Sequence, residues 1–328
     1  MSEGFIEDCE KRVLLFDGAM GTEIQQINPK LEDFPDKKDG FNDGLILSRP
    51  EWIRQIHLSY LSAGADCIET NTFGSNKLKL KEYGFENKTV EFNKTAAELA
   101  REACAAFSNK SRYIIGSMGP TGYLPSSEDP DLGQKSLGEI REAFALQAEG
   151  LILGKVDALL IETSQDILEV KLAIEACHYA IQKTKPNKKI SIIANVTLDQ
   201  YGKMLLGTNV QAAYTTVSDM GIDVFGINCS TGPVEMTPSV RWLDEQEELP
   251  ILVMPNAGMP QNEGGKAVYK MTPNEIAEKL EDFIQNYNRL RLIGGCCGTR
   301  PTHINELRRM LDKQLKQQKM QRLEHRIA

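Results

Sequence analysis

The sequence predicts an α/β protein built as a (β/α)8 TIM barrel in a single domain. Eight short apolar, β-branched runs occur along the 328 residues, and each ends in polar or small residues. Successive run ends lie between about 27 and 52 residues apart, which leaves room for a crossover helix in every interval. The alternative fold is a two-domain α/β protein, which should show a linker. Residues 183–189 (KTKPNKK) are instead typical of an exposed loop.

The expected strands follow the apolar runs in chain order. They are RVLLFDG (12–18), DCIETNT (66–72), YIIGSMG (113–119), DALLIET (157–163), SIIANVT (191–197), DVFGINC (223–229), ILVMPNA (251–257) and RLIGGCC (291–297).

Helix start signals lie in the intervals between these runs. Three segments place Ser or Thr three residues before a glutamate, the pattern of a capping box: Ser48–Glu51, Ser136–Glu139 and Thr272–Glu275. After the first of them, Gly64 is expected to end a helix. The apolar residues of that helix are at helical spacing: Ile53, Ile56, Tyr60 and Leu61.

These patterns divide the chain into three parts. We expect an N-terminal extension at residues 1–12, the barrel at residues 13–304, and a charged C-terminal helix or linker stub at residues 305–328. A charge run of this kind is usually a solvated helix face. A docking helix for a partner protein is the alternative interpretation.

Composition excludes several classes of protein. Hydrophobic residues make up 41% and charged residues 26% of the chain, the balance of a soluble globular protein. A net charge of −8 argues against nucleic acid as a partner, because phosphate binding needs a basic face. The charged N-terminus lacks the apolar run of a signal peptide, and no stretch is long enough to cross a bilayer. We therefore expect a cytoplasmic protein without a membrane partner.

The seven cysteines are odd in number and scattered, which argues against a disulfide framework. Four of them are expected to be small buried hydrophobic residues: Cys9, Cys67, Cys104 and Cys177. The other three, Cys229, Cys296 and Cys297, lie at the carboxyl ends of the sixth and eighth strands. Active-site groups of such barrels gather at these strand ends. The remaining strand ends supply Asp17, Glu69, Asn71, Glu162, Asn195, Asn228 and Asn256.

Three converging thiols suit a soft tetrahedral ion, and zinc is the usual choice. Three ligands leave one position open, as in catalytic zinc sites. The flanking glycines, Gly294, Gly295 and Gly298, are expected to allow backbone angles that turn adjacent side chains toward one ion. Buried core cysteines and a redox pair are the alternatives, although a disulfide between adjacent residues is strained.

A zinc ion with three thiolates is a weak Lewis acid and favours a fourth, soft ligand. This preference points to a thiol as the substrate. The ion would lower the pKa of that thiol from about 8.5, while the sulfur stays nucleophilic. The implied reaction is alkyl transfer to sulfur. Asp17 and Glu162 are candidates to hold the ammonium of an amino-acid substrate, and the turn at residues 18–21 to offer NH groups to its carboxylate. Each acidic residue has a loop-capping role as its alternative.

Five motifs, in this order, resemble the homocysteine S-methyltransferase family, and within it most closely the N-terminal homocysteine module of the cobalamin-dependent methionine synthases. They are DGAMGT, IETNTFGSN, GINCSTGP, PNAGMP and IGGCCGTRPTHI. The resemblance extends from about Val13 to Ile304. It implies a (β/α)8 barrel in which Cys229, Cys296 and Cys297 bind one Zn²⁺ and the thiolate of L-homocysteine takes the fourth position.

The resemblance also implies contacts to substrate and a source of the methyl group. Substrate-binding residues are expected at Asp17, Gly18, Ala19, Met20, Glu162 and Asn228. L-Methionine would be the product, with the methyl group delivered by a separate protein bearing methylcobalamin, or by methyl-folate. The cobalamin signature Asp-x-His-x-x-Gly is absent around all four histidines. Gly74 and Arg300 depart from the residues frequent in the family, and neither is an expected metal ligand.

Two alternatives for function stay open. One is a stand-alone homocysteine methyltransferase that uses S-methylmethionine, S-adenosylmethionine or betaine, whose cationic centres an aromatic-lined opening would favour. The other is a homocysteine-binding module of a split or larger synthase, inactive until a corrin protein is supplied.

Overall fold

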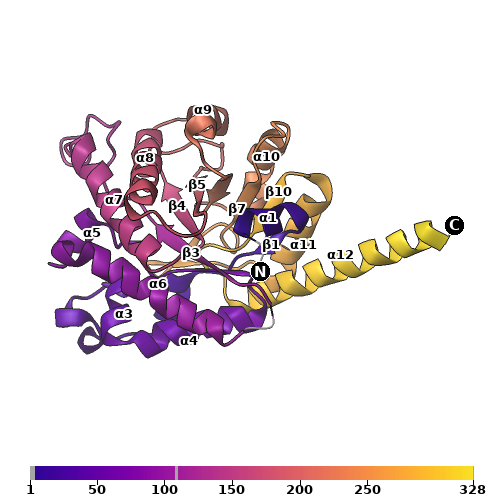
Figure 1. Cartoon of the computed structure of the whole chain (residues 1–328), viewed down its shortest axis with the longest axis horizontal. Coiled ribbons are helices and arrows are strands. Elements are labelled where there is room, and N and C mark those ends of the chain that lie inside the picture. Colours follow the sequence, from indigo (N-terminus) through magenta and orange to yellow (C-terminus); the bar gives the residue numbers. More distant parts are fainter. Residues whose placement is uncertain (1–3, 108–109, 328) are drawn as a thin grey trace.

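The computed structural model describes residues 4–107 and 110–327, and it has the predicted barrel (Figure 1). Eight parallel strands form its sheet: β1 (Leu14–Leu15), β2 (Cys67–Glu69), β3 (Tyr113–Met118), β4 (Ala158–Ser164), β5 (Ser191–Val196), β6 (Val224–Asn228), β7 (Ile251–Met254) and β10 (Leu290–Ile293). Paired neighbours follow the order β1-β10-β7-β6-β5-β4-β3-β2. A parallel bridge between Phe16 and Cys67 joins the two ends of this row and closes the ring. All eight predicted strands are confirmed.

Helices occupy the intervals between the strands and cover the outside of the barrel (Figure 1). The α-helices are α1 (Phe5–Lys11), α2 (Met20–Ile27), α3 (Leu45–Ser48), α4 (Pro50–Ala63), α5 (Lys77–Glu82), α6 (Thr89–Ala105), α7 (Leu137–Leu153), α8 (Ile167–Thr184), α9 (Val210–Val217), α10 (Pro233–Asp244), α11 (Pro273–Asn286) and α12 (Pro301–Ile327). Short 3-10 helices are η1 (Leu31–Asp33), η2 (Pro35–Lys37), η3 (Asn42–Gly44), η4 (Glu86–Lys88) and η5 (Ser218–Met220).

Two of the three predicted capping boxes are confirmed, at Ser136 and at Thr272. The prediction that Ser48 caps α4 was wrong. Ser48 is the last residue of α3, so its backbone is not in the extended conformation of an N-cap, and Arg49 precedes α4 instead. The C-terminal end of α4 is as predicted, because Gly64 has a left-handed φ of 105°.

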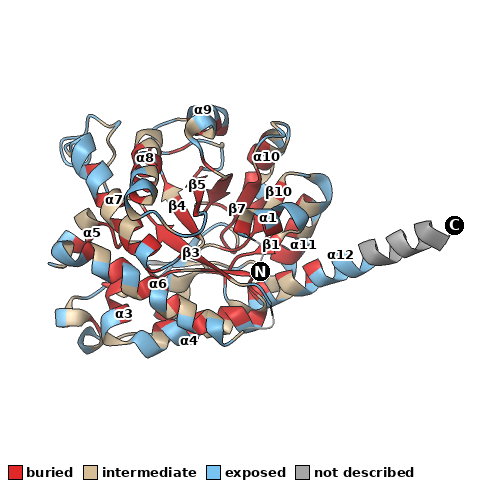
Figure 2. Ribbon diagram, viewed as in Figure 1, coloured by how far each residue is buried: buried red, intermediate tan, exposed pale blue. Residues whose placement is uncertain are grey.

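Residues of each barrel strand alternate between the barrel interior and the surrounding helices. In β3, Tyr113 and Ile115 belong to the interior cluster of buried side chains, whereas Ile114 and Met118 pack with the helices. Figure 2 shows the result: the strands are buried, and exposed residues lie on the outer faces of the helices. Where a strand reaches its carboxyl end, the next inward position faces the mouth of the barrel.

Helix α1 closes the amino-terminal end of the barrel. Phe5 and Cys9 belong to the interior cluster, and the Phe5 ring meets the Tyr113 ring edge-on with centroids 5.4 Å apart. Part of the predicted extension therefore belongs to the barrel core. Cys9, Cys67 and Cys177 are fully buried, as expected for core cysteines. For Cys104 that expectation was wrong, because its side chain is only partly buried where it packs against the core.

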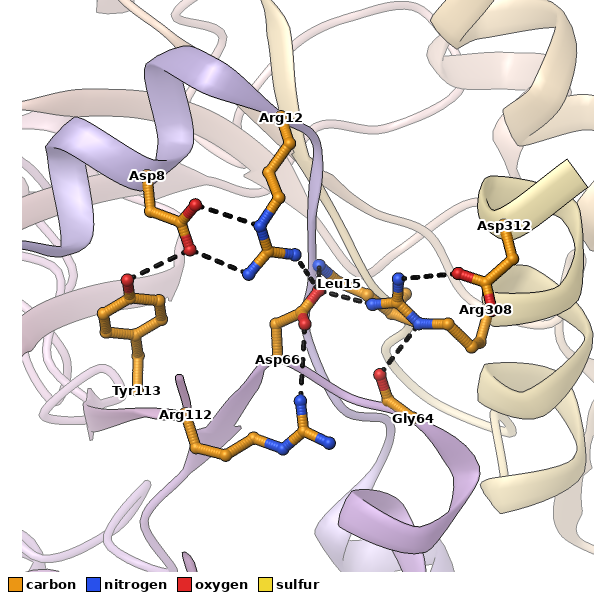
Figure 3. A network of polar contacts seen from close by, with 9 residues as sticks. All are labelled: Asp8, Arg12, Leu15, Gly64, Asp66, Arg112, Tyr113, Arg308 and Asp312. Carbon is orange, nitrogen blue, oxygen red and sulfur yellow. Dashed lines mark hydrogen bonds and ion pairs between the residues drawn. The ribbon is translucent and has the colours of Figure 1, made fainter. Parts of the chain in front are cut away.

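A network of charged side chains joins α1, β2 and α12 at the same end of the barrel (Figure 3). Asp66 accepts a hydrogen bond from the Leu15 amide at 3.0 Å. The same carboxylate pairs with Arg12 at 3.0 Å, with Arg112 at 3.5 Å and with Arg308. This network fixes the start of α12 against the barrel.

Helix α12 packs against the barrel with one end only. Ile304, Leu307 and Leu311 are buried, whereas Leu315 is 41% exposed. Figure 1 shows the helix continuing away from the barrel toward the C-terminus. The predicted C-terminal helix is present, and it starts at Pro301. None of the helices in the described ranges is long and apolar enough to cross a membrane.

Candidate metal and substrate site

The three cysteines singled out by the sequence meet at the carboxyl ends of β6 and β10. The Sγ atoms of Cys229, Cys296 and Cys297 all lie within 4.8 Å of one another, and those of Cys229 and Cys297 are 3.7 Å apart. Two sulfurs bound tetrahedrally to one zinc ion at about 2.3 Å would lie about 3.8 Å apart. The residues therefore fit a zinc ion. In the described part of the chain, no other group of this kind was found.

Local backbone geometry directs these sulfurs inward. Cys229 and Ser230 both have left-handed φ angles, 63° and 62°, immediately after β6. The Cys229 amide donates to the Met254 carbonyl at 3.1 Å, and the Cys296 amide to the Pro255 carbonyl at 2.8 Å. Hydrogen bonds to the neighbouring strand end thus fix the two cysteine segments on opposite sides of β7.

The glycines around the cysteine pair serve two different purposes. Gly298 has a φ of 79°, as predicted for a residue that needs backbone freedom. For Gly294 and Gly295 that prediction was wrong, because neither has a positive φ. They are required by close packing instead. A Cβ on Gly294 would lie 2.6 Å from the Cβ of Phe16, and one on Gly295 would overlap Thr299.

Hydrogen bonds among the three sulfurs and Tyr269 shift the pKa values of the cysteines. The Cys229 and Cys296 thiols and the Tyr269 hydroxyl donate to Cys297, which lowers the pKa of Cys297 to about 3. Hydrogen bonds with Cys229 and with Cys297, together with burial, raise the pKa of Cys296 well above its ordinary value. One thiolate is thus stabilised among its neighbours, and a cation at this place would stabilise all three.

Tyr269 was missed by the sequence analysis. It follows a hairpin of β8 (Gln261–Glu263) and β9 (Lys266–Val268) that projects from the loop after β7. Gly264 and Gly265 form its two-residue turn with positive φ angles of 60° and 84°. A Gly-Gly pair between short alternating segments is a hairpin signal, so the element was detectable, but the contact of Tyr269 with Cys297 was not.

Asn228, the last residue of β6, links the cysteines to the acidic side of the site. Its Nδ2 donates to the Thr163 Oγ1 at 2.8 Å, and lies 3.5 Å from Glu162 Oε2 and 3.9 Å from Cys296 Sγ. Its Oδ1 accepts from the Thr163 amide at 2.9 Å. Asn228 is fully buried, and its side-chain amide lies between Glu162 and Cys296.

Glu162 is a buried carboxyl group on β4. It accepts a short hydrogen bond from the Ser117 hydroxyl. Burial raises the pKa of Glu162 to about 7, against the effect of that hydrogen bond, and the negative charge of Cys297 adds to the rise. A positively charged ligand group beside Glu162 would favour its ionised form.

Asp17 lies just beyond β1 and is 2% exposed. Its Oδ2 accepts from the Glu69 amide at 3.1 Å, whereas its Oδ1 is buried without a partner among the described residues. Burial raises the pKa of Asp17 well above its ordinary value. The Ala19 amide already donates to the Thr299 carbonyl oxygen at 3.3 Å. Of the predicted backbone donors, the amides of Gly18 and Met20 are those left for a ligand.

Gly74 and Arg300, which differ from the residues frequent in the family, make contacts outside the cysteine cluster. The Gly74 amide donates to Asp43 Oδ2 at 2.6 Å, and a Cβ on Gly74 would lie 2.8 Å from that oxygen. Arg300 pairs with Glu23 at 2.9 Å. Neither contact includes a cysteine of the site.

Comparisons with known proteins identify a family for this chain. The sequence model of the family described as Homocysteine S-methyltransferase matches residues 14–311. The chain is 40% identical over 304 residues to the methionine synthase of Mycobacterium tuberculosis and 38% identical to that of Mycobacterium leprae. Each match covers 92% of this chain, which spans about a quarter of the length of these relatives.

Solved structures show the same fold. The homocysteine methyltransferase MmuM from Escherichia coli, in its metallated form, superposes with a TM-score of 0.72. The match covers 90% of this chain and 95% of that one at 23% sequence identity. At this identity the likeness concerns the fold alone.

Proposed function

Because the chain belongs to the homocysteine S-methyltransferase family, we propose that it methylates the thiolate of L-homocysteine to give L-methionine, with one zinc ion as cofactor. The observation on which this proposal depends is the cluster of three cysteine sulfurs within 4.8 Å at the mouth of the barrel. Three thiolates suit zinc, and they leave one tetrahedral position for a substrate thiol.

In this proposal Cys229, Cys296 and Cys297 hold the metal. A bound zinc ion would supply the positive charge that lowers the pKa of the substrate thiol below neutrality. Asn228 contributes by fixing both Cys296 and Glu162, so that the sulfur and the amino end of the substrate are held at a set separation.

The amino-acid end of homocysteine would bind between the acidic strand ends and the turn after β1. Glu162 and Asp17 would accept hydrogen bonds from the ammonium group, since both are buried and Asp17 Oδ1 has no partner among the described residues. The amides of Gly18 and Met20 would donate to the substrate carboxylate. These contacts orient the thiol toward the three cysteines.

The methyl donor in this proposal is methylcobalamin on a separate protein. Support comes from the resemblance to cobalamin-dependent methionine synthases and from the 40% identity to a methionine synthase. A small cationic donor such as S-methylmethionine, S-adenosylmethionine or betaine is the second candidate. The aromatic ring of Tyr269, next to Cys297, favours it because such rings attract sulfonium and quaternary ammonium groups.

Elemental analysis tests the metal site. Protein purified under reducing conditions should contain about one zinc per chain, as expected for a single Cys₃ site. Cys229→Ala and Cys296→Ala should both abolish the zinc, whereas Cys104→Ala, outside the site, should retain it. A metal-free wild type that still binds homocysteine would contradict the proposed role of the cysteines.

Turnover with different donors tests the reaction. Methionine formation is expected when a methylcobalamin-bearing protein is supplied together with homocysteine. Formation with S-methylmethionine, S-adenosylmethionine or betaine alone would favour the second candidate. Zinc and homocysteine binding without turnover under any of these conditions would favour a binding module of a larger assembly.

A further inference from the structure

We propose that Glu69 is a third carboxyl group of the ammonium pocket, so that Asp17, Glu69 and Glu162 each accept one N–H of a primary ammonium. The inference rests on the proposed function, because it concerns the amino end of the same substrate. Glu69 was noted in the sequence only as a polar strand end, without a role.

The position of Glu69 in β2 directs its side chain toward the mouth of the barrel. Cys67 belongs to the interior cluster, and Ile68 belongs to the cluster that packs with the helices. Glu69 therefore takes the next inward position. In β4 the same alternation applies, with Leu160 inside and Ile161 outside, so Glu162 points inward as well.

No positively charged side chain among the described residues forms an ion pair with Glu69. Its amide donates to Asp17 Oδ2 at 3.1 Å, which sets the two acidic residues beside each other. Glu69 Oε1 and Asp17 Oδ1 are both buried and lack a hydrogen-bond partner within the described ranges. Each of these two carboxyl groups thus has one acceptor oxygen that no group of the described residues uses.

Glu162, which points inward near the end of β4, faces the same mouth of the barrel as Glu69 and Asp17. Burial raises the pKa of Glu69 well above its ordinary value, and the charges of Glu162 and Asp17 raise it further. Three carboxyl groups that repel one another in a buried space are stabilised by a cation. A primary ammonium has three N–H donors, one for each of them.

A further inward-facing residue near the strand ends, Asn195, also has polar atoms without partners among the described residues. Asn195 lies inward on β5, two residues after Ile193 of the interior cluster, and is fully buried. Neither Nδ2 nor Oδ1 of Asn195 has a hydrogen-bond partner in the described part of the chain. Buried amides are nearly always hydrogen-bonded, so a polar group is expected to reach this layer.

Binding of two thiols to the zinc-loaded protein tests the inference. Homocysteine carries the ammonium group, and 4-mercaptobutanoate is the same molecule without it. By calorimetry, Glu69→Gln should weaken homocysteine about 10- to 100-fold, as expected when a hydrogen bond to a charged group is lost. Its effect on 4-mercaptobutanoate should stay below about threefold. Asp17→Asn should show the same selective loss.

Glu86→Gln is the matched control. Glu86 also has a buried carboxylate oxygen without a partner among the described residues, but it lies on η4, outside the strand ends. This variant should bind both thiols as the wild type does. Equal weakening of both thiols by Glu69→Gln would indicate a structural role and overturn the inference.

Two further outcomes separate the inference from the proposed function. A Glu69→Gln variant that binds homocysteine as tightly as the wild type would overturn the inference and leave the proposed function standing. A zinc-loaded wild type that binds no homocysteine would overturn both. N-acetylhomocysteine, which lacks the ammonium charge, should bind the wild type no better than 4-mercaptobutanoate.

Discussion

Among single residues, Asp66 is the carboxylate with the most charged partners at the amino-terminal end of the barrel. Arg12, Arg112 and Arg308 all pair with it, and its side chain is 4% exposed. Asp66→Asn would leave three guanidinium groups without their shared anion. We expect the free energy of unfolding to fall by about 3–5 kcal/mol, measured by denaturant titration.

Asp312 supplies the control for this prediction. It pairs with the same Arg308 at 3.5 Å, but its side chain is 50% exposed. Solvent screens such a pair, so Asp312→Asn should change the free energy of unfolding by at most about 0.5 kcal/mol. Equal effects of the two substitutions would contradict the role assigned to burial.

Glu169 on α8 gives the molecule a pH-dependent contribution to stability. Its Oε1 accepts from the Thr121 amide at 2.8 Å, and Oε2 is buried without a partner among the described residues. Burial raises the pKa of Glu169 to about 7 from 4.5. A raised pKa means that the folded state holds the proton more tightly, so this stabilisation is present below pH 4.5 and is lost as pH rises through 7.

Glu169→Gln should remove this dependence. From pH 5 to pH 8 the free energy of unfolding of the variant should rise by up to about 3 kcal/mol relative to that of the wild type. Denaturant titrations at several pH values measure this difference. Glu139→Gln is a control of opposite sign. Hydrogen bonds from Ser136 lower the pKa of Glu139 from its ordinary 4.5, so the free energy of unfolding of the wild type should rise relative to that variant only as pH rises toward 4.5, and the difference should stay constant from pH 5 to pH 8. If the difference in free energy of unfolding between Glu169→Gln and wild type stayed constant from pH 5 to pH 8, the raised pKa assigned to Glu169 would be contradicted.

At the scale of an element, the capping sequences of α4 and α7 look alike but act differently. Ser136 Oγ accepts from the Glu139 amide at 3.2 Å and caps α7. Ser48 Oγ is buried without a partner in the described part of the chain. Ser136→Ala should cost about 1 kcal/mol of stability, whereas Ser48→Ala should be neutral or stabilising. Thermal unfolding of both variants checks this, and a larger loss for Ser48→Ala would contradict it.

Helix α12 has an anchored end and an exposed end. Leu307→Ala should cost about 2–5 kcal/mol, because its side chain is fully buried against the barrel. Leu315, two turns further on, is 41% exposed, and Leu315→Ala should cost less than about 0.5 kcal/mol. Denaturant titration distinguishes the two. If methyl transfer from a partner protein fell with Leu315→Ala while stability held, α12 would be a docking helix.

For the whole molecule, the proposed metal site lies on a barrel whose ring of strands is closed without it. The strands close through the bridge between Phe16 and Cys67, which includes none of the three cysteines of the site, and the interior is filled by apolar side chains. Removing zinc with a chelator should therefore leave far-UV circular dichroism and cooperative unfolding intact, unlike in a zinc finger. Added zinc should raise Tm by mass action. Loss of the cooperative transition on chelation would contradict this prediction.

Much of the site was predictable because a barrel collects its strand ends at one face. Because the eight apolar runs predict a closed barrel, Cys229 and the pair Cys296–Cys297 are expected at the same mouth, although 67 residues separate Cys229 from Cys296. The sequence also distinguished these cysteines from Cys67, which lies inside a predicted strand. Periodicity and strand ends are local properties, so they can be read along the chain.

The sequence by itself determined the eight-stranded barrel, two of the capping boxes and the residues of the cysteine cluster. Only the tertiary structure decided which partner each side chain has. In the tertiary structure, Tyr269 lies beside Cys297 and Glu69 lies beside Asp17. The Ala19 amide donates to Thr299, and the Ser48 hydroxyl has no partner among the described residues and caps no helix. These contacts join segments far apart in the chain or depend on a neighbour's backbone angle, and no local pattern encodes either.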